Sequence, residues 1–388
     1  MIHVAIVGIG AISPAHIEAY KRFADLCEVT VLCDLDLKKA KEKAQDYGLK
    51  RVPVFKDIDE ICADPEIDLV SICTPPSTHA SIAVRLLKAG KHVLIEKPMA
   101  ASLEECDLIN QTAKEQNRIV SVIAQNRFFT PMMKVKQILD QQLIGKVLHS
   151  QVDSFWWRGN CYYDLWWRGT WEKEGGGCTL NHAVHHIDIL QWMNGMPTEV
   201  TAIMSNTAHD NAEVEDLSVA ILKYKDGSIA QITSSVVHHG EEQQIIFQGE
   251  KARISVPWRI HASTSSANGF PNKDSDTEQT INDLYENLPS VVHEAHLGQI
   301  HDVLLAIQGG TPVLVDGQQG RQTLELITAI YKSASEKKTV TLPLKADDSF
   351  YTKESILKNT IYFHEKTVSV DGFDTEDITT GGKYDQTT

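Results

Sequence analysis

Lys97 and His185 are the two side chains whose surroundings best suit acid–base chemistry. Lys97 comes two residues after the apolar run His92–Ile95, and His185 follows a triple glycine at residues 175–177. Oxidation of a secondary alcohol by hydride transfer needs a base for the hydroxyl proton and a donor or cation for the developing alkoxide. Lys97 and His185 are of the types that fit these two roles.

Asn181, His185 and Asp188 are spaced by four and three residues, which would place them on one face of a helix. Asn181 cannot ionise, so its side chain can hold a substrate hydroxyl or the histidine but cannot act as a carboxylate partner. Asp188 has two interpretations that the sequence leaves open. It either orients a neighbouring group or makes structural hydrogen bonds.

A glycine pair near the start of the chain indicates a dinucleotide site. Gly8 and Gly10 end an apolar strand pattern and precede a helix pattern, for which Ser13 is the expected N-cap and Pro14 the first helical residue. Gly8 permits a tight turn, Gly10 lets the backbone approach a pyrophosphate, and the helix N-terminus favours the anion. The third glycine of the fingerprint is absent, so the glycines alone do not establish the site.

Asp34 supports the same interpretation. It ends the second strand pattern, 24 residues after Gly10, where a carboxylate accepts hydrogen bonds from the adenosine ribose. Its charge would repel a 2′-phosphate, so it predicts NAD in preference to NADP. Lys38 and Lys39 lie one turn into the next helix and would favour NADP, but we interpret them as part of a solvated helix face.

An aromatic segment precedes His185. Aromatic faces stack on sugar rings while Arg and Tyr donate to hydroxyl groups, which indicates a sugar-binding segment. The alternative is a packed aromatic cluster or a subunit contact. The segment contains Trp156, Trp157, Trp166, Trp167 and Trp171, interleaved with Arg158, Tyr162, Tyr163 and Arg168.

A metal site is another interpretation of the residues around His185. His182, His185, His186, Asp188 and Cys178 are all of types that bind zinc or iron. However, His182 and His186 share a helix face that is rotated away from His185, which fits one catalytic histidine with two packed ones. We expect turnover without a metal ion.

The elements that must position these residues follow from the hydrophobic pattern. Up to about residue 124, short apolar runs alternate with amphipathic helices, which is typical of βαβ units and a parallel sheet. The expected strands are His3–Val7, Glu28–Cys33, Leu69–Cys73, His92–Ile95 and Ile119–Ala124. The expected helices include Leu37–Tyr47, His79–Ala89 and Leu103–Gln116.

After about residue 145, longer alternating strands and hairpin turns indicate a mostly antiparallel sheet. Val219–Tyr224 and Ser228–Ser234 flank one such turn at Asp226-Gly227. From Lys345 onward the periodicity fades, and the polar stretch Asp371–Thr388 is expected to be a frayed or arm-like tail. Further expected elements are helices around Ala295–Gln308 and Gly320–Ser335 and a strand at Thr339–Leu344.

The composition narrows the class of partner. With 37 Lys and Arg against 52 Asp and Glu, the net charge of −15 argues against nucleic-acid and anionic-membrane surfaces. No apolar run has the length of a spanning helix or the form of a signal peptide. The seven scattered cysteines are expected to be reduced, which predicts a cytoplasmic protein with small-molecule partners.

Several of these motifs together resemble the glucose–fructose oxidoreductase / inositol dehydrogenase / MocA (Gfo/Idh/MocA) family. The specific part of the resemblance is Glu96-Lys97-Pro98 combined with the glycine-rich motif that contains His185, and the likeness covers residues 1–344. Many relatives have Asp at the position of Asn181. The other motifs are Gly8-x-Gly10 with His16, Cys73-Thr74-Pro75-Pro76-x-x-His79, Asp316-Gly317 and Val340–Leu344.

The resemblance implies an α/β Rossmann domain with a doubly wound parallel sheet, followed by an α+β domain with a large open, mostly antiparallel sheet. We expect these domains at residues 1–124 and 125–344, with an extension at 345–388. The open sheet is expected to mediate a homo-oligomer, a dimer or a tetramer. The implied activity is NAD-dependent oxidation of a sugar, glycoside or cyclic polyol. A non-catalytic sensor of NAD or sugar is the alternative, because a fold alone does not establish chemistry.

The resemblance also assigns residues to the site. The catalytic residues would be Lys97, His185 and Asn181, with His185 as the base and Lys97 orienting the hydroxyl. Cofactor contacts would come from Gly8, Gly10, Ala11, Ile12, Asp34, Thr74, Pro75, His79, Glu96 and Lys97. Substrate contacts would come from Arg127, Trp157, Arg158, Tyr163, Trp167, Arg168, Asn181 and His182. The stretch from Tyr163 to Trp171 resembles the branch of the family that acts on glucosides or nucleotide sugars, often at C3.

Overall fold

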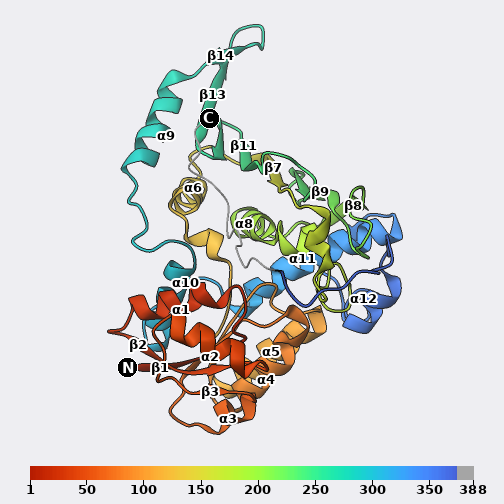
Figure 1. Ribbon diagram of the computed structural model, residues 1–388. Coiled ribbons are helices and arrows are strands. Elements are labelled where there is room, and N and C mark those ends of the chain that lie inside the picture. The colour runs from red at the N-terminus through yellow and green to blue at the C-terminus, as the bar shows by residue number, and fades with distance from the viewer. Residues whose placement is uncertain (374–388) are drawn as a thin grey trace.

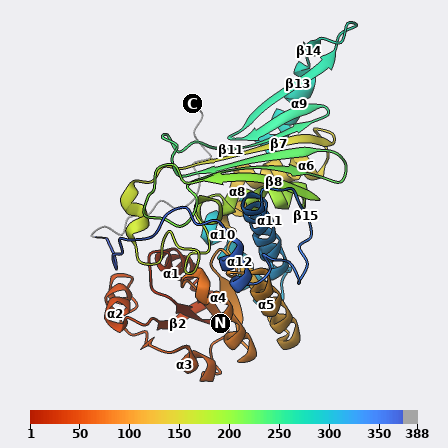
Figure 2. The same cartoon turned by 90° about the vertical axis from the view of Figure 1, so that its right-hand side faces the viewer.

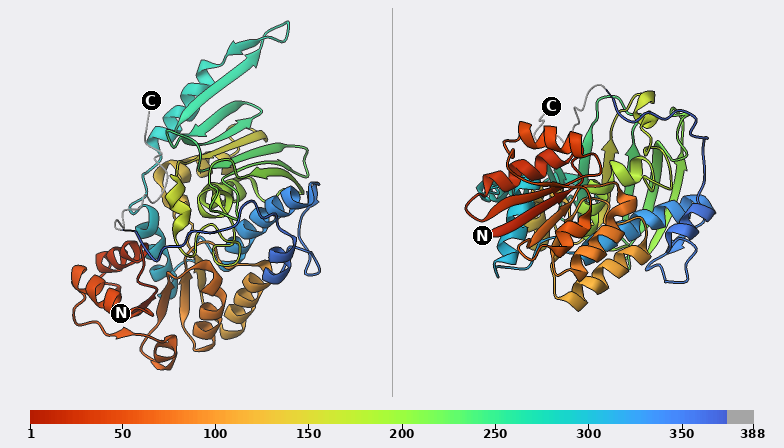
Figure 3. Two further views of the ribbon diagram at one scale, coloured as in Figure 1. Left: turned by 45° about the vertical axis from the view of Figure 1, so that its right-hand side comes forward. Right: turned by 60° about the horizontal axis from the view of Figure 1, so that its bottom comes forward.

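Two sheets with helices between them make up the protein. The structure, a computed structural model, describes residues 1–373. Figure 1 shows the first sheet at the base of the molecule and the second at the top, and the chain passes from one to the other through α6 (Thr130–Asp140). Figure 3 shows the hairpin of β13 (Arg259–Ser265) and β14 (Pro271–Lys273), with the helix α9 (Ser275–Asn287) beside it, extending beyond the rest of the second sheet.

The first sheet is parallel and has six strands in the order β3-β2-β1-β4-β5-β6. This is the doubly wound order, and the strand order reverses between β1 and β4. All five strands expected from the sequence are present, and the sheet adds β3, a two-residue edge strand that is too short to give a pattern. The strands are β1 (Ile2–Val7), β2 (Cys27–Cys33), β3 (Val54–Phe55), β4 (Leu69–Ile72), β5 (His92–Ile95) and β6 (Val120–Val122).

The helices of this half begin where prolines and short polar residues favour a first turn. The expected helix at 79–89 starts three residues earlier, because Pro75 and Pro76 provide its N-cap and first position. The prediction for Ser13 was wrong by one residue: Ile12 is the N-cap, and the Ser13 hydroxyl donates to the Gly10 carbonyl at 2.9 Å. The helices are α1 (Ser13–Arg22), α2 (Leu37–Asp46), α3 (Ile58–Ala63), α4 (Pro76–Lys88) and α5 (Leu103–Gln116).

The second sheet has nine strands in the order β14-β13-β12-β11-β7-β10-β9-β8-β15. It is antiparallel except where β10 pairs with β7. Buried and exposed residues alternate along β8 and β9, so one face packs inward and the other is open. The strands are β7 (Val147–Phe155), β8 (Glu199–Ser205), β9 (Leu217–Lys223), β10 (Ile229–Ser235), β11 (Gln243–Gly249), β12 (Ala252–Val256), β13 (Arg259–Ser265), β14 (Pro271–Lys273) and β15 (Val340–Thr341).

Two helices, α8 and α11, cover the inner face of this sheet and lie between it and the first sheet (Figure 2). Another helix, α10, packs on α1 and so joins the two halves (Figure 1). The helices of the second half, besides α6, are α7 (Cys178–Asn181), α8 (Val184–Asn194), α9 (Ser275–Asn287), α10 (Ala295–Ile307), α11 (Gly317–Glu336) and α12 (Lys353–Asn359), with short 3₁₀ turns at Gln125–Phe128 and Asn160–Asp164.

The extension after residue 344 is structured where it is described, although its sequence shows no periodicity. Phe350 is fully buried, and α12 follows it. The next residues, 361–370, bond to the aromatic segment and to Asn211 rather than to a sheet or a helix, which leaves no periodic signal in the sequence. Most of the expected tail, Asp371–Thr388, lies outside the described residues. Among residues 1–373, no helix is long and apolar enough to cross a membrane.

Candidate functional site

The turn after β1 has the shape that a phosphate-binding loop requires. Gly8 has a φ of +88°, and a Cβ there would lie 2.8 Å from the Cys73 carbonyl carbon, so the close approach of two strands also requires glycine. No atom lies within 4 Å of a Cβ built on Gly10, which leaves room beside the backbone for a phosphate group. Ala11 and Ile12 continue this turn into α1.

Asp34 lies at the end of β2 and faces the same turn. Its Oδ2 accepts the Ile9 N–H at 2.6 Å, and its Oδ1 accepts the Asp36 N–H at 2.8 Å. A carboxylate has about four acceptor positions, so the two oxygens keep capacity for ribose hydroxyls. Lys38 is exposed and 4.0 Å from Glu42, which agrees with a solvated helix face.

Thr74 and Pro75 follow β4 at the same edge of the sheet, as expected for cofactor contacts. His79 has a different place. It is fully buried, and its ring nitrogens lie 2.8 Å from the Thr74 carbonyl and 2.9 Å from the Pro98 carbonyl. His79 therefore holds two loops together and has no exposed edge for a cofactor. The Glu96 carboxylate is also buried, and it contacts His16 rather than the site.

Lys97 reaches from the end of β5 to the second half of the chain. Its Nζ donates to the backbone carbonyl of Asn181 at 3.0 Å. Burial lowers the pKa of Lys97, the nearby Glu96 opposes this shift, and Arg168 adds to it. The Asn181 side chain donates to the Gly176 carbonyl at 3.2 Å, so Asn181 meets Lys97 through its backbone rather than through its amide.

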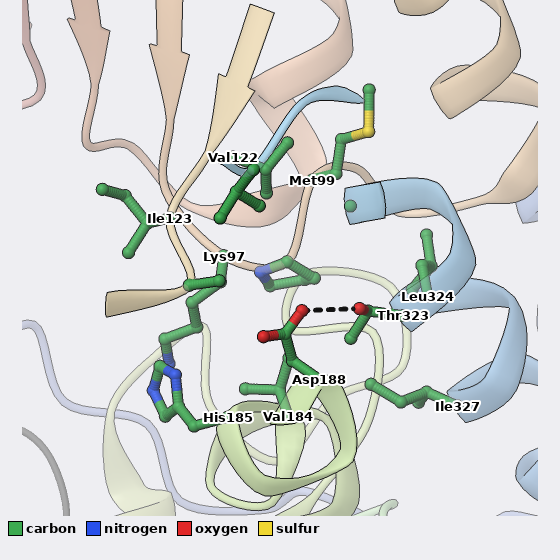
Figure 4. Close-up of a pocket in the computed structure, with 14 residues that line it drawn as sticks. Lys97, Met99, Val122, Ile123, Val184, His185, Asp188, Thr323, Leu324 and Ile327 are labelled. Atoms are coloured by element: carbon green, nitrogen blue, oxygen red, sulfur yellow. Dashed lines mark hydrogen bonds between the residues drawn. The ribbon is translucent and has the colours of Figure 1, made fainter. Parts of the chain in front are cut away.

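His185 lies beside Lys97 in the first turn of α8. Figure 4 shows the two side chains pointing toward one another at one side of a pocket whose other walls include Val122, Val184 and Leu324. Burial lowers the pKa of His185 well below its usual value, and the charge of Lys97 lowers it further. A histidine whose pKa is lowered in this way is neutral near pH 7, so a ring nitrogen can accept a hydrogen bond from a substrate hydroxyl.

The expectation that Asn181, His185 and Asp188 share one continuous helix is wrong. The helix α7 ends at Asn181, and α8 begins at Val184. The Ala183 N–H donates to the Cys178 carbonyl, five residues back, and this wider turn interrupts the regular ladder. The break nevertheless leaves the Asn181 carbonyl and the His185 ring on the same side, toward Lys97.

Asp188 and Arg127 form a buried ion pair. Arg127 donates from Nε at 2.7 Å and from Nη2 at 2.8 Å, and the Thr323 hydroxyl donates to the same carboxylate at 2.9 Å (Figure 4). Arg127 is completely buried. The structure thus favours the structural interpretation of Asp188, and it contradicts the expectation that Arg127 contacts substrate.

Several side chains in and near the aromatic segment lie around Tyr162. Arg168 stacks on Tyr162 and on Trp167 with guanidinium-to-centroid distances of 4.2 and 4.3 Å. The Tyr162 hydroxyl lies 3.4 Å from His182 Nε2, and Arg158 lies 5.6 Å from the Tyr162 ring. These groups form a cationic and aromatic wall, and the pKa of Lys97 responds to the charge of Arg168.

Four other members of the segment are placed differently. Tyr163 is buried, with its ring 5.0 Å from the His209 ring, so the expected substrate contact from Tyr163 is contradicted. Gly169 packs against it, because a Cβ there would approach the Tyr163 ring to 3.0 Å. Trp157 is exposed at the rim and stacks on His239. Trp156 and Trp171 are core residues, as the packed-cluster alternative predicts for part of the segment.

Residues 361–370 of the extension hold this segment in place. The Trp171 indole N–H donates to the Ile361 carbonyl at 3.0 Å. The Trp166 N–H donates to the Val370 carbonyl at 2.9 Å, and the Val370 N–H donates to Asp164 at 2.8 Å. The extension is therefore part of the scaffold of the candidate substrate site.

Three residues of the site were missed by the sequence analysis. Gln125 lies 3.5 Å from His185 Nε2, and its buried Oε1 has no partner among the described residues. It follows β6 at the carboxyl edge of the sheet, and that position could have indicated it. Glu174 is buried against Arg168 at 3.3 Å, and burial raises its pKa to about 7. Lys43 reaches the Gly10 carbonyl at 3.0 Å.

A doubly wound sheet with a glycine turn, an acidic residue after β2 and a Lys–His pair at its carboxyl edge defines a nicotinamide-dependent oxidoreductase. Comparison with known proteins gives the family. Residues 2–124 match the model "Oxidoreductase family, NAD-binding Rossmann fold", and residues 136–342 match "Oxidoreductase family, C-terminal alpha/beta domain". The chain belongs to the Gfo/Idh/MocA family and is an NAD-dependent oxidoreductase.

Individual relatives agree with this assignment. The chain is 24% identical to the myo-inositol 2-dehydrogenase of Thermotoga maritima over 87% of this chain and 98% of the relative. It is 23% identical to the levoglucosan dehydrogenase of Pseudarthrobacter phenanthrenivorans over 88% of this chain and 98% of that relative. A similar solved structure is the WlbA dehydrogenase from Bordetella pertussis in complex with NADH and UDP-GlcNAcA. The TM-score is 0.76 and the identity 28%, and the match covers 89% of this chain and 98% of that chain.

Proposed function

We propose that this protein oxidises a secondary hydroxyl of a sugar, a glycoside or a cyclic polyol to a ketone, with Lys97 and His185 at the reacting carbinol. One observation carries the proposal: Lys97, from the cofactor-binding half, lies against Asn181 and beside His185 from the other half. When bound, NAD supplies the acceptor for the hydride. The relatives described above, which act on inositol and levoglucosan, support this substrate class.

In this proposal the protein residues divide the proton chemistry. His185 is the base in this proposal, because its neutral ring lies beside Lys97, where the reacting hydroxyl would bind. Lys97 donates to the substrate oxygen and stabilises its developing negative charge. Asn181 fixes the direction of Lys97 through its carbonyl. No step uses a metal ion.

The cofactor contacts are proposed to come from the turn and the strand ends. Gly8, Gly10, Ala11 and Ile12 would bind the pyrophosphate, and Asp34 would bind the adenosine ribose. Thr74, Pro75 and Lys97 would border the nicotinamide half, with His79 and Glu96 supporting these loops from behind. The fit rests on the open space beside Gly10 and on the unused acceptor capacity of Asp34.

The substrate is proposed to bind against the cationic and aromatic wall around Tyr162. His182 Nδ1 is buried and has no hydrogen-bond partner among the described residues, and Gln125 Oε1 is in the same situation. A polyhydroxylated ring offers donors and acceptors to both while its C–H face meets Trp167 and Tyr162. Arg158, Arg168 and Trp157 would contact the outer part of the ligand. We propose a glucoside oxidised at C3 as the first substrate to test.

We also propose a homo-oligomer formed through the open face of the second sheet. Ile203, Val219 and Ile221 are exposed there on neighbouring strands, with 76% exposure for Ile203. A contiguous apolar face of this kind favours contact between copies.

We further propose a division of the chain into residues 1–124, 125–344 and 345–388. We also propose a cytoplasmic location, with which the seven unbonded cysteines are consistent. NADH formation from glucosides, aldoses and inositols tests the central part of the proposed function.

A further inference from the structure

A group of potential metal ligands lies outside the proposed reaction site. His16 comes from α1, Glu96 from the end of β5, and His296 from the start of α10. One ligand atom from each residue lies within 4.8 Å of the others. Within residues 1–373 no other group of this kind is found. In particular, the His182, His185 and His186 cluster considered from the sequence is not such a group, because His186 bonds to Ser154 and His182 faces Tyr162.

The spacing of the three ligand atoms suits a small divalent ion. His16 Nε2 is 3.0 Å from Glu96 Oε1, and His296 Nε2 is 3.4 Å from the same oxygen. Zinc binds His nitrogen and carboxylate oxygen at roughly 2.0–2.2 Å, which separates neighbouring tetrahedral ligands by about 3.4 Å. Two of the three separations are therefore within about 0.4 Å of those in a tetrahedral zinc site, and the third, between the two histidine nitrogens, is no more than 4.8 Å.

His296 gives an independent indication of a ligand. Only 8% of this residue is exposed, yet its Nε2 has no hydrogen-bond partner within the described part of the chain. The nitrogen lies 3.4 Å from Glu96 Oε1 without forming a hydrogen bond to it. An unpaired buried nitrogen costs free energy unless a ligand satisfies it, so the position of His296 is explained if an ion lies between it and the carboxylate.

The surroundings of the group resemble the outer shell of a metal site. His16 Nδ1 lies 3.1 Å from the Ser71 hydroxyl, which in turn lies 2.6 Å from Tyr20, so the His16 ring is oriented from behind. Glu96 uses its other oxygen, Oε2, to accept the Lys97 N–H at 3.1 Å.

We propose that His16, Glu96 and His296 bind one zinc ion that fastens α10 to the cofactor-binding half. The ligands come from both halves of the chain, and α10 packs directly on α1. The ion would therefore stabilise the contact between the halves. With three protein ligands the fourth position of a tetrahedral ion would be taken by water, unlike most structural zinc sites, which have four protein ligands.

The experiment measures metal binding on the full chain after removal of bound ions with a chelator. Titration with Zn²⁺ against a chromophoric chelator should give one equivalent for the wild type, and Co²⁺ should give the visible absorption of a low-coordinate site. The His296→Gln variant should bind zinc at least about 100-fold more weakly, because it loses a direct ligand. Zinc should raise the melting temperature of the wild type but not of this variant.

His301→Gln is the matched control, because His301 lies on the same helix but stacks on Phe23 outside the group. It should bind zinc as the wild type does. Failure of the wild type to bind zinc or to give the cobalt absorption would overturn the proposal without reference to any variant. Equal zinc affinity in His296→Gln and the wild type would overturn it as well, because the ion would then be held by other residues.

Discussion

The Lys97 ammonium group and the Asn181 carbonyl oxygen are 3.0 Å apart, and this hydrogen bond spans the two halves of the chain. It directs Lys97 toward His185 without a carboxylate at position 181. A backbone acceptor cannot be removed by changing the side chain. The contact therefore explains how the Lys–His pair can be kept in place with Asn, which cannot ionise, at position 181.

Replacing His185 by Ala should reduce kcat by about 10²–10⁴-fold, the usual contribution of a positioned base. Affinity for NAD should not change, because the glycine turn and Asp34 lie in the other half. Steady-state kinetics and NAD titration measure the two effects. His186→Ala is the control and should keep the wild-type kcat, since His186 Nδ1 lies 2.9 Å from the Ser154 hydroxyl and the proposal gives His186 no role in the reaction. If His185→Ala kept the wild-type kcat and its low-pH limb, the base would be another group, and Lys97 would be the next candidate.

The protein should lose stability as the pH falls from about 6.5 to about 4. Burial lowers the pKa of His186 from its usual value of 6.5 to about 4. Within that window the unfolded chain binds a proton that the folded chain does not, so acid favours unfolding, by about 3 kcal/mol from this residue. Urea unfolding at several pH values should show a flatter decline for His186→Asn than for the wild type. Parallel declines in the two proteins would show that His186 is not the group responsible.

NAD should be preferred over NADP, and Asp34→Ala should weaken that preference. The Asp34 carboxylate would bind the ribose and repel a 2′-phosphate, so its loss should raise KM for NAD roughly 10-fold or more. The ratio of kcat/KM for the two cofactors measures this. Asp36→Ala is the matched control, because Asp36 caps α2 and would not touch the ribose. A wild-type preference for NADP would mean that Lys38, Lys39 or Lys43 determines the cofactor.

Deleting residues 361–388 should lower kcat/KM for the sugar by roughly 10–100-fold, because displaced binding groups lose their alignment. These residues include the partners of Trp166 and Trp171. Deletion of 374–388 alone is the control and should have little effect, since it keeps those hydrogen bonds. NAD affinity should be the same in both. An unchanged kcat/KM in the longer deletion would show that the extension does not support the substrate site.

The sequence predicted the parallel sheet well, because each of its strands except β3 is a buried apolar run followed by a turn and a helix. The helix Leu103–Gln116 is correct at both ends, since Ser102 caps it and Asn117 ends it in a left-handed conformation. The strand β3 was missed because two edge residues give no pattern. The extension was missed because its contacts, such as those of Val370, are single hydrogen bonds to distant segments.

The sequence indicated most residues of the candidate site, but not the residues that each of them contacts. Lys97 and His185 were indicated by their motifs, whereas the direction of each side chain depends on tertiary packing. Arg127 and Tyr163 were assigned to the substrate from their types and neighbours, yet both are buried because Asp188 and His209 lie next to them. Their partners are more than 40 residues away in sequence, and no local spacing reveals such pairs.

The most direct test of the proposed function is NADH formation in the presence of NAD and a panel of glucosides, free aldoses, inositols and nucleotide sugars. NAD binding is measured on the same sample. The proposal predicts NADH formation with at least one member of the panel, most readily with a glucoside, and loss of that signal in His185→Ala. Tight NAD binding without NADH formation from any member would contradict it and would favour a protein that senses NAD or sugar without catalysis.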